Sequence, residues 1–184
     1  MHNKLINFYY FIDDFNYNEI VNLPKKINII FRNYTKLPDE HQLLKLKKIC
    51  IRNRRKLFLS NNHKLVIKLN LDGVYLPSFN KDLSVIKIKQ YNKIILGSAH
   101  DLNEINNKIK QKVDILFLSP VFKKKNNKLL GIHKFRIYSS YFKKKTVILG
   151  GVNKKNLRKI NILNCNNMAS ISFIKNGQFK NRII

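Results

Sequence analysis

Residues 146–153, Thr-Val-Ile-Leu-Gly-Gly-Val-Asn, have the pattern of a buried strand that ends in two glycines and leads into a helix. The apolar run is continuous, which is typical of a parallel strand covered by helices. Asn153 is a capping residue, and Leu157 and Ile160 follow it at helical spacing. Two glycines at a strand end let backbone N–H groups approach an anion, and a helix N-terminus favours negative charge. The pattern predicts a βα unit with a phosphate site, although Gly-Gly also occurs in plain tight turns.

Seven further apolar blocks lie along the chain, mostly separated by stretches with Leu and Ile at three- and four-residue spacing. The eight predicted strands are Asn7–Asp13, Ile27–Asn33, Lys56–Asn61, Gly73–Pro77, Lys93–Ala99, Asp114–Phe122, Thr146–Val152 and Met168–Phe173. Repeated βα units with eight strands favour a small (β/α)₈ TIM barrel of the α/β class, with an open α/β sheet as the second choice. The first helix is weakly patterned and the tail is polar, so we expect weak or vestigial first and last helices.

One helix start between these blocks is well marked. Asp101 is the expected N-cap, with Glu104 at the capping-box position. Ile105 and Ile109 follow with a spacing that places them on one buried face.

The charge balance is the most extreme feature of the composition. There are 37 Lys and Arg against 10 Asp and Glu, a formal net charge of +27. Such a charge suggests a nucleic-acid partner. However, the basic residues are mostly Lys, spread along a chain that is also rich in Asn and Ile, as in AT-rich coding sequences. We therefore expect a solvated, anion-friendly surface and consider nucleic-acid binding the weaker interpretation.

Length and cysteine content give further expectations about the number of domains and the location of the protein in the cell. The 184 residues fit one domain, 1–184, and contain no run of about eighteen apolar residues that would span a membrane. The N-terminus runs into a strand-like block without the apolar core of a signal peptide. Cys50 and Cys165 have no ligand-like neighbours, so we expect free thiols in a reducing compartment and a cytoplasmic location.

Polar residues gather where the strands stop, and in a barrel these C-terminal strand ends form the functional site. Arg32 is expected at the barrel mouth as a clamp for a phosphate or a pyrimidine edge, the alternative being a surface arginine. Ser60 and Asn61 end the third strand, and Ser98 lies near the end of the fifth. The lysine-rich loop 123–128 is expected either to close over a polyphosphate or to be an ordinary solvated loop.

Two other positions complete the predicted site. Ile171 and Ser172, at the eighth strand, would complete the phosphate site begun by Gly150 and Gly151. His100 is expected to be a capping or supporting residue rather than a general base.

Taken in order, blocks over residues 7–175 resemble those of the thiamine-phosphate synthase/TenI family. LDGVYLPS resembles that family's ADGVHLGQ and VQLPS, ILGSAH its IGVSTH, LFLSPVF its IGVGPVF, LLGIHKF its PLGLEGL, VILGGVNKKNL its VAIGGITPEN, and MASISFI its GVAVVSAI. The resemblance implies a barrel that acts in thiamine biosynthesis on small phosphorylated thiazole and pyrimidine ligands.

Synthases of this family are transferases that join hydroxymethylpyrimidine diphosphate to thiazole phosphate with Mg²⁺ and release pyrophosphate. The resemblance implies that the leaving pyrophosphate is stabilised by cationic groups. The implied catalytic residues are Arg32, Ser98, Lys125 and Lys128. The implied substrate-binding residues are Ser60 and Asn61, and the thiazole phosphate would be bound by the backbone at Gly150, Gly151, Ile171 and Ser172.

The chain departs from the family pattern on the pyrimidine side. The Gln-x-Arg-x-Lys strand end reads Ile-Phe-Arg-Asn-Tyr at residues 30–34, so only Arg32 is kept. The two carboxylates that would hold Mg²⁺ read Asn61 and Asn80, and amides bind a hard cation far less strongly. No metal ligand is therefore assigned; Asp82 could substitute after a loop shift, and Asp14 is the other carboxylate that could restore metal binding.

The cofactor expected for this chain depends on whether it is an active synthase. Mg²⁺ is expected only if the chain is an active synthase, and otherwise no cofactor is expected. The position of the TenI-type histidine reads Pro120, as in synthases. A synthase is the leading interpretation, and a TenI-like tautomerase or accessory protein is the alternative.

Overall fold

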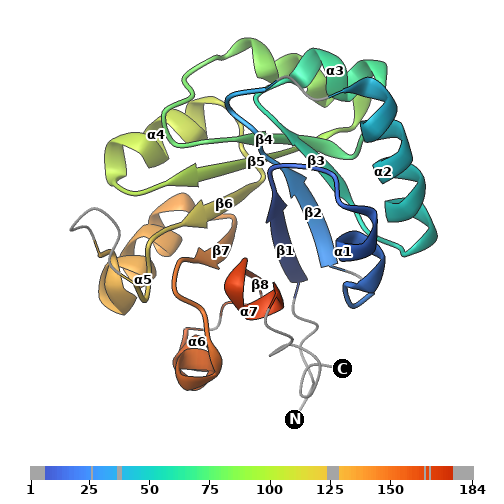
Figure 1. The fold of residues 1–184 in the computed structure, drawn as a ribbon. Coiled ribbons are helices and arrows are strands. Elements are labelled where there is room, and N and C mark those ends of the chain that lie inside the picture. Colours follow the sequence, from blue (N-terminus) through green and yellow to red (C-terminus); the bar gives the residue numbers. More distant parts are fainter. Residues whose placement is uncertain are drawn as a thin grey trace.

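The computed structural model describes residues 7–25, 27–36, 39–123, 129–163, 165 and 167–175, which form a closed barrel of eight parallel strands (Figure 1). The strands follow one another around the barrel in sequence order. The ladder from Asn7 to Asn167 pairs the first strand with the last and closes the barrel. This arrangement confirms the (β/α)₈ TIM barrel and excludes the open sheet.

All eight predicted strands are present, and most end one to four residues earlier than predicted. The strands are β1 (Asn7–Ile12), β2 (Ile27–Phe31), β3 (Leu57–Ser60), β4 (Gly73–Leu76), β5 (Ile94–Ala99), β6 (Ile115–Leu118), β7 (Lys145–Leu149) and β8 (Asn167–Ala169). The helices are α1 (Tyr17–Asn22), α2 (Glu40–Arg52), α3 (His63–Lys68), α4 (Leu102–Lys110), α5 (Gly131–Phe142), α6 (Leu157–Ile162) and α7 (Ser172–Lys175), with 3₁₀ helices η1 (Ser84–Tyr91) and η2 (Lys154–Asn156). As expected, α1 and α7 are short.

The interior of the barrel is filled by a cluster of mostly large side chains. Each strand contributes to it, and the members are Tyr9, Phe11, Ile30, Phe58, Tyr75, Leu96, Phe117, Val147 and Ala169. Phe117 lies at the centre, with ring centroids 5.0 Å from Tyr9 and 5.6 Å from Tyr75. Aromatic rings in edge-to-face contact fill this space, so the barrel is a packed core rather than a pore.

A second apolar cluster lies between the strands and the surrounding helices. The helix α2 buries Leu43, Leu46 and Ile49 on one face. The cap of α4 is confirmed, since Asp101 accepts a hydrogen bond from Glu104 N at 2.9 Å. The capping box is wrong in one detail, because Glu104 Oε2 accepts from His100 N instead of Asp101 N.

The predicted buried face of α4 is wrong at its C-terminal end. Ile109 is 44% exposed, whereas Lys108 is fully buried. The reason is Gly97 on β5, whose missing side chain leaves room for the Lys108 stem; a Cβ there would lie 3.0 Å from Lys108 Cδ. A long aliphatic stem can pack in this way when its charged end reaches acceptors.

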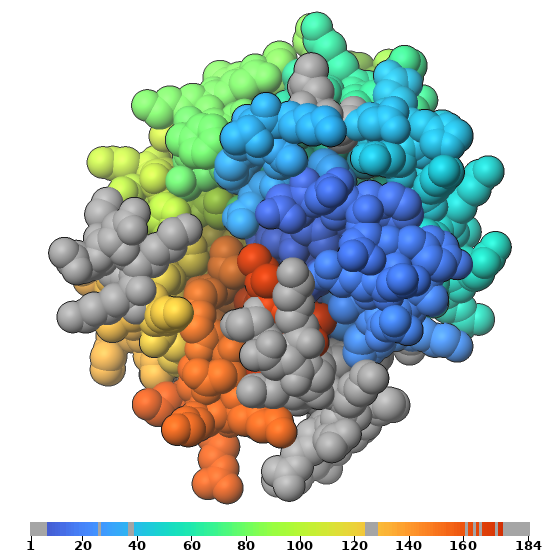
Figure 2. Space-filling model, viewed as in Figure 1, coloured from blue at the N-terminus to red at the C-terminus, as the bar shows by residue number. Residues whose placement is uncertain are grey.

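The surface view in Figure 2 shows the blue α1 segment and the red α7 segment on the same face, near the seam between β1 and β8.

Cys50 and Cys165 are both free thiols, as expected. Among the described residues no helix is long and apolar enough to cross a membrane.

Candidate functional site

Three of the predicted residues, Arg32, Ser60 and Ser98, lie at the mouth of the barrel because side chains alternate along a strand. Side chains two positions apart on a strand lie on the same face. Each of them follows a residue of the barrel interior by two positions: Arg32 follows Ile30, Ser60 follows Phe58 and Ser98 follows Leu96. The three predicted side chains therefore lie just beyond these interior residues, at the C-terminal ends of their strands.

Arg32 occupies the mouth as predicted, and aromatic rings hold it there. Its guanidinium carbon lies 4.5 Å from the ring centroid of Phe11 and 5.8 Å from that of Tyr34. Burial raises the pKa of Tyr34, and the nearby Arg32 charge opposes that shift. A cation over aromatic faces is stabilised without an acidic partner.

Tyr75 links Arg32 to Ser98 below the mouth. Burial raises the pKa of Tyr75 to about 12, against smaller effects from a hydrogen bond with Ser98 and from the Arg32 charge. Ser60 Oγ is buried near Tyr34 and has no hydrogen-bond partner of normal geometry among the described residues. The sequence did not single out Tyr75, since a Tyr inside an apolar strand reads as core.

The loop after β7 has a backbone that only glycine tolerates. Gly150 and Gly151 have φ angles of +92° and +78°. A Cβ on Gly150 would lie 2.9 Å from Pro120 Cα, and one on Gly151 would lie 2.6 Å from Lys123 Cβ and 2.7 Å from Lys123 N. Both glycines are therefore required by conformation and by the close approach of the loop after β6.

The carbonyls of this loop accept hydrogen bonds, whereas its first N–H groups have no acceptor within the part of the chain that the structure describes. Gly150 O accepts from Phe122 N at 2.9 Å, and Gly151 O accepts from Asn156 Nδ2 at 2.7 Å. The N–H groups of Gly150 and Gly151 donate to no other described residue. The predicted Asn153 cap is confirmed, because its side chain accepts from Asn156 N at 3.2 Å.

The loop after β8 lies beside the glycine loop. Ser170 Oγ donates to Val152 O at 3.5 Å and so joins the two loops. The Ile171 N–H also lacks an acceptor among the described residues. Gly150, Gly151 and Ile171 thus place N–H groups that lack a described acceptor at two adjacent strand ends, where such groups can bind an anion. Of Ser172 only the backbone is described, at the start of α7.

A small cavity joins the two halves of the predicted site. It measures about 100 Å³ and is lined by Phe11, Ile12, Asp13, Asp14, Glu19, Arg32 and Ile171. Arg32 and Ile171 thus face one space at the barrel mouth. No cluster of three His, Cys, Asp or Glu side chains suited to a metal ion occurs among the described residues.

The lysine-rich loop begins at the glycine loop, where Lys123 packs against Gly151. Lys125 and Lys128 lie outside the described residues, so their predicted role remains a prediction. His100 Nδ1 donates to the carbonyl of Ser119 at 2.6 Å, and its expected supporting role remains a prediction.

Asn61 and Asn80, at the ends of β3 and β4, are hydrogen-bonded to each other. Asn80 Nδ2 donates to Asn61 Oδ1 at 3.0 Å. Behind them lie two residues that the sequence did not single out, Lys108 and Gln111, both fully buried. The available signal was Gly97, a glycine inside a buried strand, which marks space for a long neighbouring side chain.

Burial of Lys108 predicts an unusual pH dependence of stability. Burial lowers its pKa to about 8, against a smaller opposing effect of Glu104. Between this pKa and the ordinary value near 10.4, the unfolded chain binds a proton that the folded chain does not, so stability rises with pH. From pH 7 to pH 9.5, we expect the unfolding free energy of the wild type to rise by about 2 kcal/mol relative to that of Lys108→Met. Urea denaturation across this range measures it, and a constant difference would contradict the prediction.

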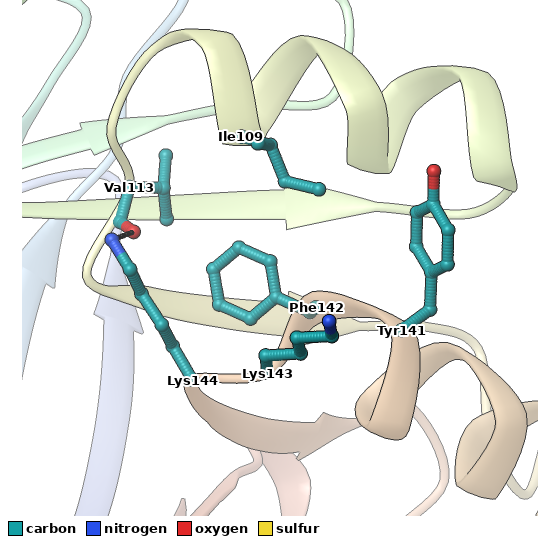
Figure 3. A pocket seen from close by; sticks show the side chains of 6 residues that line it. All are labelled: Ile109, Val113, Tyr141, Phe142, Lys143 and Lys144. Atoms are coloured by element: carbon teal, nitrogen blue, oxygen red, sulfur yellow. Dashed lines mark hydrogen bonds between the residues drawn. The ribbon is translucent and has the colours of Figure 1, made fainter.

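A second cavity lies away from this site, between α4 and α5 (Figure 3). It measures about 430 Å³ and is lined by Ile109, Val113, Tyr141, Phe142, Lys143 and Lys144. Lys144 Nζ closes one side by donating to Val113 O at 3.1 Å. The cavity is at the N-terminal ends of β6 and β7, opposite to the predicted site, and contains none of the predicted residues.

Comparisons with known proteins bear on the family and the fold of this chain. The family model described as "Thiamine monophosphate synthase" matches residues 27–174. A Thiamine-phosphate synthase of Pelagibacter ubique is 28% identical over 183 residues, covering 94% of this chain and 84% of that protein. One of Prochlorococcus marinus subsp. pastoris is 24% identical over 159 residues, covering 83% of this chain but only 45% of the relative. The chain thus spans less than half the length of that Prochlorococcus protein.

The fold has a counterpart among solved structures. Thiamine phosphate pyrophosphorylase from Pyrococcus furiosus superposes with a TM-score of 0.75 at 21% identity, covering 92% of this chain and 87% of that one. At this identity the likeness concerns the fold alone. The match of the family model over most of the chain shows more: this chain belongs to the thiamine monophosphate synthase family.

Proposed function

We propose that this protein acts in thiamine biosynthesis, binding thiazole phosphate at the loops after β7 and β8 and joining it to hydroxymethylpyrimidine diphosphate. The observation that carries the proposal is that the N–H groups of Gly150, Gly151 and Ile171, at two adjacent strand ends, have no acceptor among the residues the structure describes. A phosphate group accepts several hydrogen bonds at once and favours such a cluster. Membership of the thiamine monophosphate synthase family supports the choice of these two ligands.

In the proposed reaction, the bond between the pyrimidine methylene carbon and the diphosphate oxygen breaks, and its electron pair leaves with pyrophosphate. The thiazole nitrogen then attacks the resulting carbocation and forms the new C–N bond. Arg32, held at the mouth, stabilises the charge that develops on the leaving group. Lys125 and Lys128 are proposed to assist from their loop, while Ser60, Asn61 and Ser98 position the pyrimidine diphosphate.

A second candidate is a TenI-like or accessory role, in which the thiazole phosphate is bound but no coupling occurs. The hydrogen bond between Asn61 and Asn80 favours it, since these two positions would be carboxylates in a metal-dependent synthase. The two candidates share the phosphate site and differ on the pyrimidine side.

Pyrophosphate release from both ligands together, compared with each ligand alone, tests the proposal. We expect calorimetric binding of thiazole phosphate and release only when both ligands are present. Binding without release would establish the accessory role. Absence of thiazole phosphate binding would contradict both candidates.

A further inference from the structure

Polar side chains behind the ends of β3 and β4 form a chain of hydrogen bonds that runs from the interior to the barrel mouth. Lys108 Nζ donates to Gln111 Oε1 at 2.9 Å and to Asn80 O at 2.8 Å. Gln111 Nε2 donates to Asn80 Oδ1 at 2.8 Å, and Asn80 Nδ2 donates to Asn61 Oδ1 at 3.0 Å. The chain begins at a fully buried ammonium group and ends at an exposed amide.

The direction of this chain is fixed by groups that can only donate. An ammonium group has no acceptor, so Gln111 must present its oxygen to Lys108 and its nitrogen to Asn80. Independently, the backbone N–H of Asp82 donates to Asn80 Oδ1 at 3.0 Å. Asn80 therefore faces Asn61 with its nitrogen, and the assignment does not rest on a free choice of amide orientation.

This direction does not suit a divalent cation. Mg²⁺ requires oxygen ligands, preferably carboxylates. Asn80 presents an N–H group to Asn61, and the Asn61 oxygen is already used as an acceptor. The residues present at these two positions therefore do not fit the metal that a synthase of this family implies.

The same direction suits an anion. Asn61 Nδ2 ends the chain and has no acceptor among the described residues. Each donor in the chain is polarised by the one behind it, back to the Lys108 ammonium group. Hydrogen bonds to a charged oxygen are also stronger than those to a neutral one.

We propose that Asn61 Nδ2 binds an oxygen atom of the pyrimidine diphosphate directly, where a metal-dependent site would bind it through a cation. The identity of this anion rests on the proposed function. Lys108, Gln111 and Asn80 are positioning residues that keep Asn61 oriented. Ligand binding is then independent of Mg²⁺.

Titration of hydroxymethylpyrimidine diphosphate in EDTA and in Mg²⁺ tests this proposal. The wild-type affinities in the two buffers are expected to agree within about threefold, a difference below 1 kcal/mol. In the double variant Asn61→Asp/Asn80→Asp, two carboxylates would face the anion, so affinity in EDTA is expected to fall at least about 30-fold and to recover with Mg²⁺. The control Asn18→Asp/Asn103→Asp adds the same charge at two exposed positions and should change affinity less than about threefold.

Two outcomes would overturn the proposal: a tenfold or greater gain in wild-type affinity on adding Mg²⁺, or a folded Asn61→Asp/Asn80→Asp variant that behaves like the control. A titration with Mn²⁺ alone, followed by electron paramagnetic resonance, needs no organic ligand. No saturable Mn²⁺ site is expected on the wild type, and stoichiometric binding there would contradict the proposal. If neither organic ligand binds in any buffer, the proposed function and the anion contact of Asn61 both fail, while the Mn²⁺ titration still decides whether the Asn61–Asn80 pair binds a divalent cation.

Discussion

Gly151→Ala is expected to weaken thiazole phosphate binding at least about 100-fold, close to 3 kcal/mol. The new methyl group would lie 2.6 Å from Lys123 Cβ and 2.7 Å from Lys123 N, at a φ of +78°. Since one of these contacts is backbone, the two loops must separate, and the N–H groups of the phosphate site move with them. Isothermal titration calorimetry with thiazole phosphate measures the effect at a temperature where the variant is folded.

Gly131→Ala is the matched control. Gly131 has nearly the same φ, +73°, but a Cβ added there would meet nothing within 4 Å. It therefore carries the conformational cost of about 1 kcal/mol without the collision. Its affinity should stay within about threefold of the wild type. Equal affinities for the two alanine variants would show that the glycine loop does not bind the phosphate.

Arg32→Ala is expected to weaken binding of the pyrimidine diphosphate at least about 30-fold, near 2 kcal/mol, while thiazole phosphate affinity stays within about twofold. Arg32 supplies positive charge at the mouth and is held over Phe11. Arg32→Lys keeps the charge but loses the planar fork, so it should recover only part of the affinity. Calorimetric titration of each ligand separates the two sides of the site.

The control for this prediction is Arg136→Ala, which removes an exposed arginine from α5. It lowers the net charge equally and should leave both affinities nearly unchanged. If Arg136→Ala weakened binding as much as Arg32→Ala, the effect would come from overall charge rather than from a contact at the mouth.

The strands and the glycine loop were predictable because their signals are local. Continuous apolar runs, such as Thr146–Leu149, are typical of parallel strands covered by helices, and a Gly-Gly pair before a capping Asn153 predicts the turn into a helix. Arg32 was placed at the mouth for a similar reason, since it ends an apolar strand and the C-terminal strand ends form the mouth of a barrel.

The rest of the site depends on contacts between distant parts of the chain. Helical spacing placed Ile109 on the buried face of α4, but Gly97 on a neighbouring strand makes room for Lys108 instead. The amide pair of Asn61 and Asn80 was visible as two substitutions for carboxylates. Its direction depends on Gln111, which lies 31 residues from Asn80 in sequence. No local pattern carries that information.

Selective ¹⁵N-glycine labelling tests the central claim, phosphate binding by the glycine loop, most directly. The chain has six glycines, so its amide spectrum is simple enough to follow residue by residue. On titration with thiazole phosphate, the Gly150 and Gly151 amide signals are expected to shift strongly, while those of Gly73 and Gly97, inside β4 and β5, remain in place. Saturating ligand that leaves Gly150 and Gly151 unmoved would contradict the account.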